Sequence, residues 1–172
     1  MIEQISISNS LKGRWQDEIT KYDTDGNIIS VSKTEIKNNI VVNSVSQLMA
    51  GFFTGLYTTD YFFYAIGTGT QGMSINVSGL VAEYTRKQVT VAFVDGNNNV
   101  SATPTNRVVV AANWVAGELA TGTNVVTLTE FSIFGGTNAN FANGGLAINY
   151  VAHNPISIDS STAIARKVYF TF

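Results

Sequence analysis

Apolar and polar residues alternate along most of this chain, which is the pattern of strands that bury one face. Gly, Asn and Asp interrupt the alternation at short intervals and mark turns. Strands are expected around Ile5 and Ile7 and at residues 15–22, 28–36, 61–66, 80–94, 108–115, 124–134, 146–151 and 165–172. Many short strands with frequent turns predict a mainly β fold, an antiparallel β-sandwich or jelly-roll-like domain.

One short helix is expected, at about residues 44–55, with Asn43 or Ser44 as its N-cap. Gly51 and Gly55 weaken it, so its end is the less certain boundary. Its apolar residues recur at spacings of three and four and form a single stripe: Val45, Leu48, Met49, Phe52, Phe53 and Leu56.

The length of 172 residues predicts a single domain, 1–172, that is large enough to bury a sizeable core. Its N-terminal part, about residues 1–42, contains a β-hairpin around Asp25-Gly26, a dipeptide that tight hairpin turns prefer. This N-terminal hairpin region is a candidate assembly arm, because exposed strand edges can pair with a neighbour.

Composition excludes several classes of protein. The chain has no cysteine and one histidine, which argues against disulfide scaffolds, zinc fingers and thiol catalysis. A net charge of −2 argues against a nucleic-acid binder. The sequence shows no secretory signal and no apolar run long enough to cross a membrane, so we expect folding in a cytoplasm and no membrane contact.

Charged residues make up only 13% of the chain. Depletion of charge is typical of protein–protein interface cores, whereas the alternative is a Thr- and Asn-rich β domain that is simply soluble. Trp15, Tyr22 and Trp114 are the interface candidates.

Two motifs imitate ligand sites. Residues 67–72 match the G-x-G-x-x-G dinucleotide fingerprint, but the residues that follow do not favour the required helix, so a Gly-rich turn is expected. The segment from Asp23 resembles a calcium loop, yet Gly26 and Thr34 stand at the wrong positions.

No residue is predicted to be catalytic, and neither a cofactor nor a metal is predicted. His153 lies in a turn-like context and is expected at the surface or at a strand end. Glu83, Glu118 and Glu130 lie in or beside apolar stretches, but sequence does not give the spacing that a carboxylate pair needs.

Glu83 and Arg86 are a candidate structural ion pair. On a regular strand their odd separation would place them on opposite faces, whereas a bulge or a helical turn would bring them together. The alternative is two exposed charges that contribute little.

The order of several weak motifs resembles a loose group of tailed-bacteriophage virion proteins. That group has a helix, an I-G-x-G loop, L-x-x-E-x-x-R, E-x-x-x-F and a terminal strand. The matching segments here are Gly13–Trp15, Lys37–Val41, Ala65–Thr70, Leu80 with Glu83 and Arg86, Thr129–Phe134, Gly144–Ala147 and Arg166–Phe172.

The resemblance implies a non-enzymatic structural protein of the virion, made in the host cytoplasm. Its partners would be itself, as a homo-oligomer, and major capsid or neck and tail proteins. The sequence shows no long shaft or receptor-binding tip, which favours a capsid decoration (cement) protein or a neck or tail component.

Two other classes of function stay open. A carbohydrate- or receptor-binding β-sandwich module would need exposed aromatic residues, for which Tyr57, Tyr61 and Trp114 are candidates. A small enzyme would have to use His153, Glu83 or Asp95.

Overall fold

The computed structural model describes residues 11–57 and 62–172. The strand expected around Ile5 and Ile7 lies outside these residues. The elements are β1 (Lys12–Tyr22), β2 (Ile28–Lys33), β3 (Lys37–Val41), α1 (Ser44–Phe53), β4 (Phe62–Gly67), β5 (Glu83–Phe93), β6 (Arg107–Trp114), β7 (Val126–Gly135), β8 (Leu146–Ala147), β9 (Asn149–Ile158) and β10 (Thr162–Thr171). The expectation of a mainly β chain with one short helix is confirmed.

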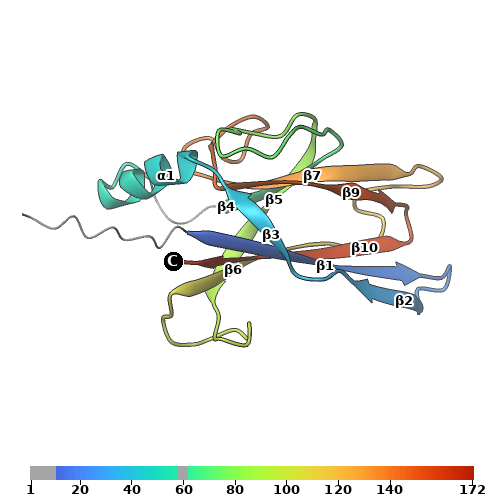
Figure 1. Cartoon of the computed structure of the whole chain (residues 1–172). Coiled ribbons are helices and arrows are strands. Elements are labelled where there is room, and N and C mark those ends of the chain that lie inside the picture. The colour runs from blue at the N-terminus through green and yellow to red at the C-terminus, as the bar shows by residue number, and fades with distance from the viewer. Residues whose placement is uncertain (1–10, 58–61) are drawn as a thin grey trace, which may run out of the picture.

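The strands close into an eight-stranded antiparallel barrel (Figure 1). Around the ring the order is β1, β10, β6, β5, β4, β7, β9 and β3, and β3 pairs with β1 again. The closing pair, β1 with β10, runs for ten residues, from Lys12 opposite Thr171 to Lys21 opposite Thr162. β3 and β2 share the other edge of β1: β3 pairs with Gly13–Trp15 and β2 with Glu18–Tyr22, and the short β8 adds to β7.

This closure replaces the two separate sheets of the expected sandwich. The first half of β5 pairs with β4, whereas its second half, from Thr90, pairs with β6. β3 pairs with β1 up to Asn39 and with β9 from Ile40. β5 therefore connects β4 to β6, and β3 connects β1 to β9, so the hydrogen-bonded ring of strands is continuous. Alternation shows which side chains are buried but not which strands pair, so the sequence did not reveal the closure.

The barrel interior is filled by aromatic and branched side chains. The Trp15 and Phe131 rings meet edge to face at 5.3 Å between centroids, and the Tyr64 and Trp114 rings meet likewise at 5.7 Å. α1 covers one end of the barrel, where its buried Leu48 joins this core (Figure 1).

A second apolar layer lies outside the barrel, on the outer face of β4, β7 and β9. Ala65, Phe134 and Tyr150 form its base, and Leu80 and Ala139 cover them from two loops. These loops, residues 68–82 and 136–145, lie over the upper face of the barrel in Figure 1. The sheet is therefore buried on both faces here, which explains the continuous apolar run in β4.

Two hairpins are closed by the same turn. In the first, the Asp23 carboxylate accepts hydrogen bonds from the backbone N–H groups of Asp25 and Asn27, and in the second Asp95 does the same with Asn97 and Asn99. These bonds mimic a backbone turn. The first hairpin is the one that the sequence predicted, and its Asp23 carboxylate is used by the turn.

Candidate functional site

The two tryptophans that were expected at an interface lie in the barrel core. Trp15 points inward from β1 and Trp114 from β6, and both are buried. Large aromatic rings fill the wide interior that a closed barrel creates, which is the physical reason for this correction. Tyr22 is half-buried and lies beside Ile29 and the exposed Val115 in a surface hollow.

The glycine-rich segment after β4 is a loop held by a buried carboxylate. Glu130, on β7, accepts hydrogen bonds from the backbone N–H groups of Gly69, Val81 and Ala82 at 2.8–3.2 Å. The Tyr150 hydroxyl donates a fourth, at 3.0 Å. Glu130 is fully buried, so these four donors replace the water that a carboxylate otherwise needs.

The glycines of this loop are required by the close approach of Glu130. A Cβ atom on Gly67 would lie 2.6 Å from the Ala82 carbonyl oxygen and 2.7 Å from a Glu130 oxygen. A Cβ atom on Gly69 would meet the same carboxylate at 2.8 Å. The loop leads through residues 68–82 into β5 without a helix, so the arrangement lacks the helix N-terminus that binds a pyrophosphate.

Glu83 and Arg86 form a bidentate ion pair. Arg86 Nε donates to Glu83 Oε1 and Arg86 Nη2 donates to Glu83 Oε2, both at 2.6 Å, and the side chains are 6% and 7% exposed. A bulge between β4 and β5 brings them to one face: Gly67 pairs with Glu83 while Ile66 pairs with Thr85. Arg86 Nη1 also donates to the carbonyl oxygens of Ala139 and Gly144, which fixes the second loop.

A second bidentate pair, which the sequence did not predict, lies inside the barrel. Asp17 on β1 and Arg166 on β10 face each other in register, and two hydrogen bonds of 2.6 Å join them. Both side chains are fully buried. The guanidinium lies over the Phe131 ring, 4.4 Å from its centroid. One sequence signal was present: each residue occupies an inward position in the alternation of its strand.

His153 belongs to this interior cluster. Its Nε2 lies 3.2 Å from Arg166 Nη2, and its Nδ1 lies 2.7 Å from the Asn154 carbonyl oxygen. Nδ1 therefore carries the proton and Nε2 accepts from Arg166. Burial, and then the Arg166 charge, lower the pKa of His153 from 6.5 to about 4. His153 is half-buried and lies within β9, not in a turn or at a strand end. Val151 faces the barrel core, so the alternation of the strand also turns the His153 ring inward, beside Trp15 and Phe131.

The remaining candidates are dispersed. Asp95 closes a hairpin, and Glu118 pairs with Lys87 at 2.5 Å. Tyr57 is half-buried beside a surface hollow, whereas Tyr61 lies outside the described residues. Within residues 11–57 and 62–172, no three acidic or histidine side chains gather as metal ligands do, and no helix has the length and apolarity that crossing a bilayer requires.

β2 has exposed apolar side chains and a free edge. All six residues of β2 are exposed, including Ile28, Ile29 and Val31 at 51–66% exposure. β2 pairs with β1 on one side only, and its other edge has no strand partner among the described residues. Lys33, its single charged residue, points to Glu18 of β1 at 2.8 Å. β2 is therefore an uncovered edge strand with apolar side chains.

Comparisons with protein-family models, with curated proteins and with solved structures give no match to this chain.

Proposed function

We propose that this protein is a non-enzymatic structural component of a tailed-phage virion, which assembles through the free edge of β2. The observation that carries the proposal is the exposure of Ile28, Ile29 and Val31 on a strand without an outer partner. The order of motifs that resembles phage virion proteins supplies the setting. Within it, the protein acts as a capsid decoration protein or as a neck or tail part.

An edge of this kind is unusual in a protein that acts alone. Edge strands are normally protected by proline, by a bulge or by an inward or unpaired charge, because open backbone groups invite pairing. β2 contains no proline. Its bulge lies at its start, where Ile29 is the extra residue, and its one charge, Lys33, lies at its end and pairs with Glu18, so the edge between them has neither device. The buried charges have a different role: Glu130 holds a loop, and Arg166 joins two strands. The charged groups of the interior therefore support the fold, and the edge is left for a partner.

We expect the partner at this edge to be a second copy of the chain. Antiparallel pairing of two β2 strands about Val31 would place Val31 opposite its counterpart and Ile29 opposite Lys33. No like charges would then face each other directly, which satisfies the pairing rule for sheets. A two-fold contact of this kind uses the same patch on both copies. Tyr22 borders the patch and is the remaining interface candidate.

Sedimentation velocity over a concentration series tests this self-association. We expect the unmodified chain to form dimers or larger oligomers, and Val31→Lys to shift it to the monomer because a charge on the edge opposes pairing. Val100→Lys is the matched control, since Val100 is equally apolar, is 74% exposed and lies away from β2. A monomer at every concentration, or equal effects of both changes, would contradict the β2 contact.

Immunogold electron microscopy tests the virion assignment itself. Antibody to this protein would be applied to purified particles from the source of the sequence, both intact and opened with detergent. Label on the head, neck or tail supports the proposal and identifies the part. Protein in the lysate without label on either preparation would overturn it.

A further inference from the structure

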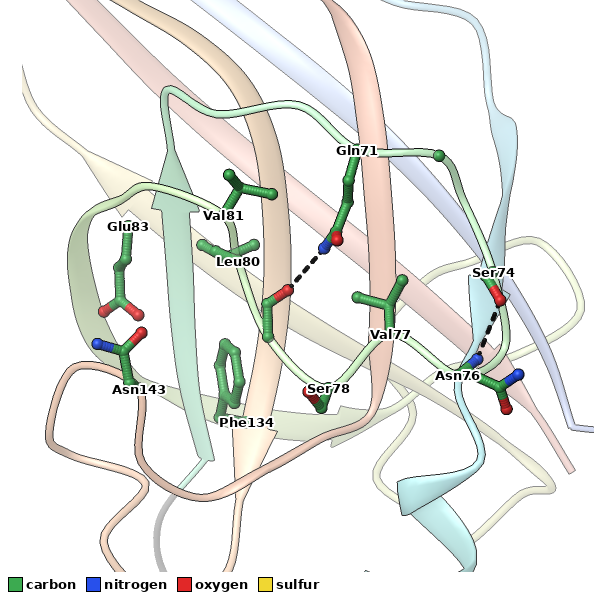
Figure 2. Close-up of a pocket in the computed structure, with 12 residues that line it drawn as sticks. Gln71, Ser74, Asn76, Val77, Ser78, Leu80, Val81, Glu83, Phe134 and Asn143 are labelled. Atoms are coloured by element: carbon green, nitrogen blue, oxygen red, sulfur yellow. Dashed lines mark hydrogen bonds between the residues drawn. The ribbon is translucent and has the colours of Figure 1, made fainter.

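The two loops over the β4–β7 face enclose a pocket of about 510 Å³, in the range of small-ligand sites. Figure 2 shows the side chains that line it. Gln71, Ser74, Asn76 and Ser78 come from the loop of residues 68–82, and Asn143 comes from the facing loop. In Figure 1 the loop of residues 68–82 lies above the barrel, whereas β2 lies at its lower right.

We propose that this pocket binds a neutral, hydroxyl-rich ligand, a saccharide of one to three rings. Its rim consists of side-chain amides and hydroxyls, each able to donate as well as to accept a hydrogen bond. Sugar hydroxyls have the same double capacity. The inference goes beyond the structural role, because it assigns a separate site.

The charges of the pocket favour a neutral ligand over an anion. The lining residues include no lysine, arginine or histidine, so a phosphate or carboxylate would find no counter-charge. The single charged lining residue is Glu83, and each of its oxygens already accepts a bond from Arg86. A carboxylate oxygen has two acceptor positions, so Glu83 can still accept from a hydroxyl. In Figure 2 its carboxylate faces the Asn143 amide.

The floor of the pocket is apolar. Leu80 and Phe134 are buried beneath the rim, and Val77 is half-buried beside them. An apolar floor under polar walls matches a sugar ring, which has C–H groups on its faces and hydroxyls around its edge. This combination does not suit a flat, fully polar ligand.

The rim is held in place before any ligand arrives. Glu130 fixes both ends of the loop through Gly69, Val81 and Ala82. Gln71 donates its side-chain N–H to the Gly79 carbonyl at 3.0 Å, which leaves its amide oxygen as an acceptor (Figure 2). Such pre-organisation reduces the entropy that binding would otherwise lose.

Titration of ¹⁵N-labelled protein with four neutral saccharides tests the inference. The probes are maltotriose, cellotriose, mannotriose and N-acetylchitotriose, which differ in linkage and substituent. At least one should shift amide signals within residues 71–83 and 143–144, while ADP and inorganic phosphate should not. Asn143→Gly and Gln71→Ala should each weaken the binding about fivefold, the effect of one lost hydrogen bond of about 1 kcal/mol. Glycine is used at position 143 because Asn143 has a φ of 61°, which alanine disfavours.

Asn140→Ala is the matched control, because Asn140 lies in the same loop but lines the neighbouring hollow beside Tyr57. It should leave the affinity unchanged. No shift with any saccharide, shifts centred on Tyr57, or shifts produced here by ADP would each overturn the inference. The sedimentation experiment on β2 is unaffected by these outcomes, so either proposal can fail alone.

Discussion

Arg86 and Arg166 are bound in the same way by their first partners. Each donates two bonds of 2.6 Å to one carboxylate, and each guanidinium lies over a phenylalanine ring, at 4.5 Å and 4.4 Å. They differ at Nη1. Arg86 Nη1 donates to two loop carbonyls, whereas Arg166 Nη1 has no hydrogen-bond partner within the described part of the chain.

Arg86 therefore stabilises one loop, whereas Arg166 stabilises the barrel as a whole. Arg86 lies near the surface and attaches a loop to β5, so its pair can become hydrated if it opens. Arg166 joins β10 to β1 at the seam that closes the barrel, and it is fully buried. Two ion pairs with equal bond lengths should therefore have unequal effects on unfolding.

The largest effect is expected from Arg166→Met. It leaves the Asp17 carboxylate buried without a partner, which should lower the free energy of unfolding by about 3–5 kcal/mol. Urea denaturation measures this loss. The double variant Asp17→Leu with Arg166→Met should regain most of it, because no unpaired charge is left. A single variant as stable as the unmodified protein would show that the pair does not hold the seam.

The next effect concerns pH and His153, which contacts Arg166 but has no counterpart near Arg86. Because the pKa falls from 6.5 to about 4 on folding, the unfolded chain binds the proton first as the pH drops. Stability should be complete above pH 6.5, decline by about 3 kcal/mol towards pH 4, and show no further His153-dependent loss below that. Unfolding at a series of pH values, compared between the unmodified chain and His153→Gln, measures this slope. An equal slope in both would contradict it.

A second acid-dependent loss should occur at lower pH. Backbone hydrogen bonds within their turns lower the pKa values of Asp23 and Asp95 below 3.8, and side-chain bonds do so for Asp159. Their stabilising contribution is present above pH 3.8 and is lost below it. His153→Gln should leave this lower window unchanged.

Arg86→Met should have a smaller and more local effect. We expect a loss of about 1–3 kcal/mol, because two loop carbonyls and a nearly buried carboxylate lose their donor. Hydrogen exchange should accelerate in residues 136–145 while β1 and β10 stay protected. Acceleration across all strands alike would remove the distinction between the two arginines.

The smallest effect is expected from Tyr64→Phe. The Tyr64 hydroxyl is buried without a hydrogen-bond partner among the described residues, so its removal should change stability by no more than about 0.5 kcal/mol. Tyr150→Phe is the matched change, since that hydroxyl donates to Glu130; it should cost about 1–2 kcal/mol. Thermal denaturation of both variants compares them, and an equal loss would contradict the assignment.

Local patterns in the sequence predicted the elements well. The helix expected at residues 44–55 is observed as Ser44–Phe53, and the strand expected at 108–115 as Arg107–Trp114. The missed strand, β3, has two polar asparagines and only a short apolar end, so it lacks a clear alternation. The second half of β9 contains Pro155, which disfavours a regular strand and is accommodated here at a bulge.

Long-range partners were not predictable from these patterns. Asp17 and Arg166 are 149 positions apart, and only the register of β1 with β10 brings them together. Glu130 looked like one acid beside an apolar stretch, yet it holds the glycine-rich loop. For Glu83 and Arg86 the sequence left two alternatives open, and the bulge at the end of β4 decided between them. Bulges change which side chains share a face, and sequence seldom marks them.

The seam between β1 and β10 also has a consequence for folding kinetics. It joins β1 to β10, so a ribosome must have added every residue from Lys12 to Thr171 before the ring can close. Until then the partly folded chain exposes the inner apolar faces of the other strands, which invites aggregation. Such distant pairings belong to the slow class of folding reactions, in milliseconds to seconds. Arg166 arrives with β10, so Asp17 stays without its partner while the 149 positions between them are synthesised.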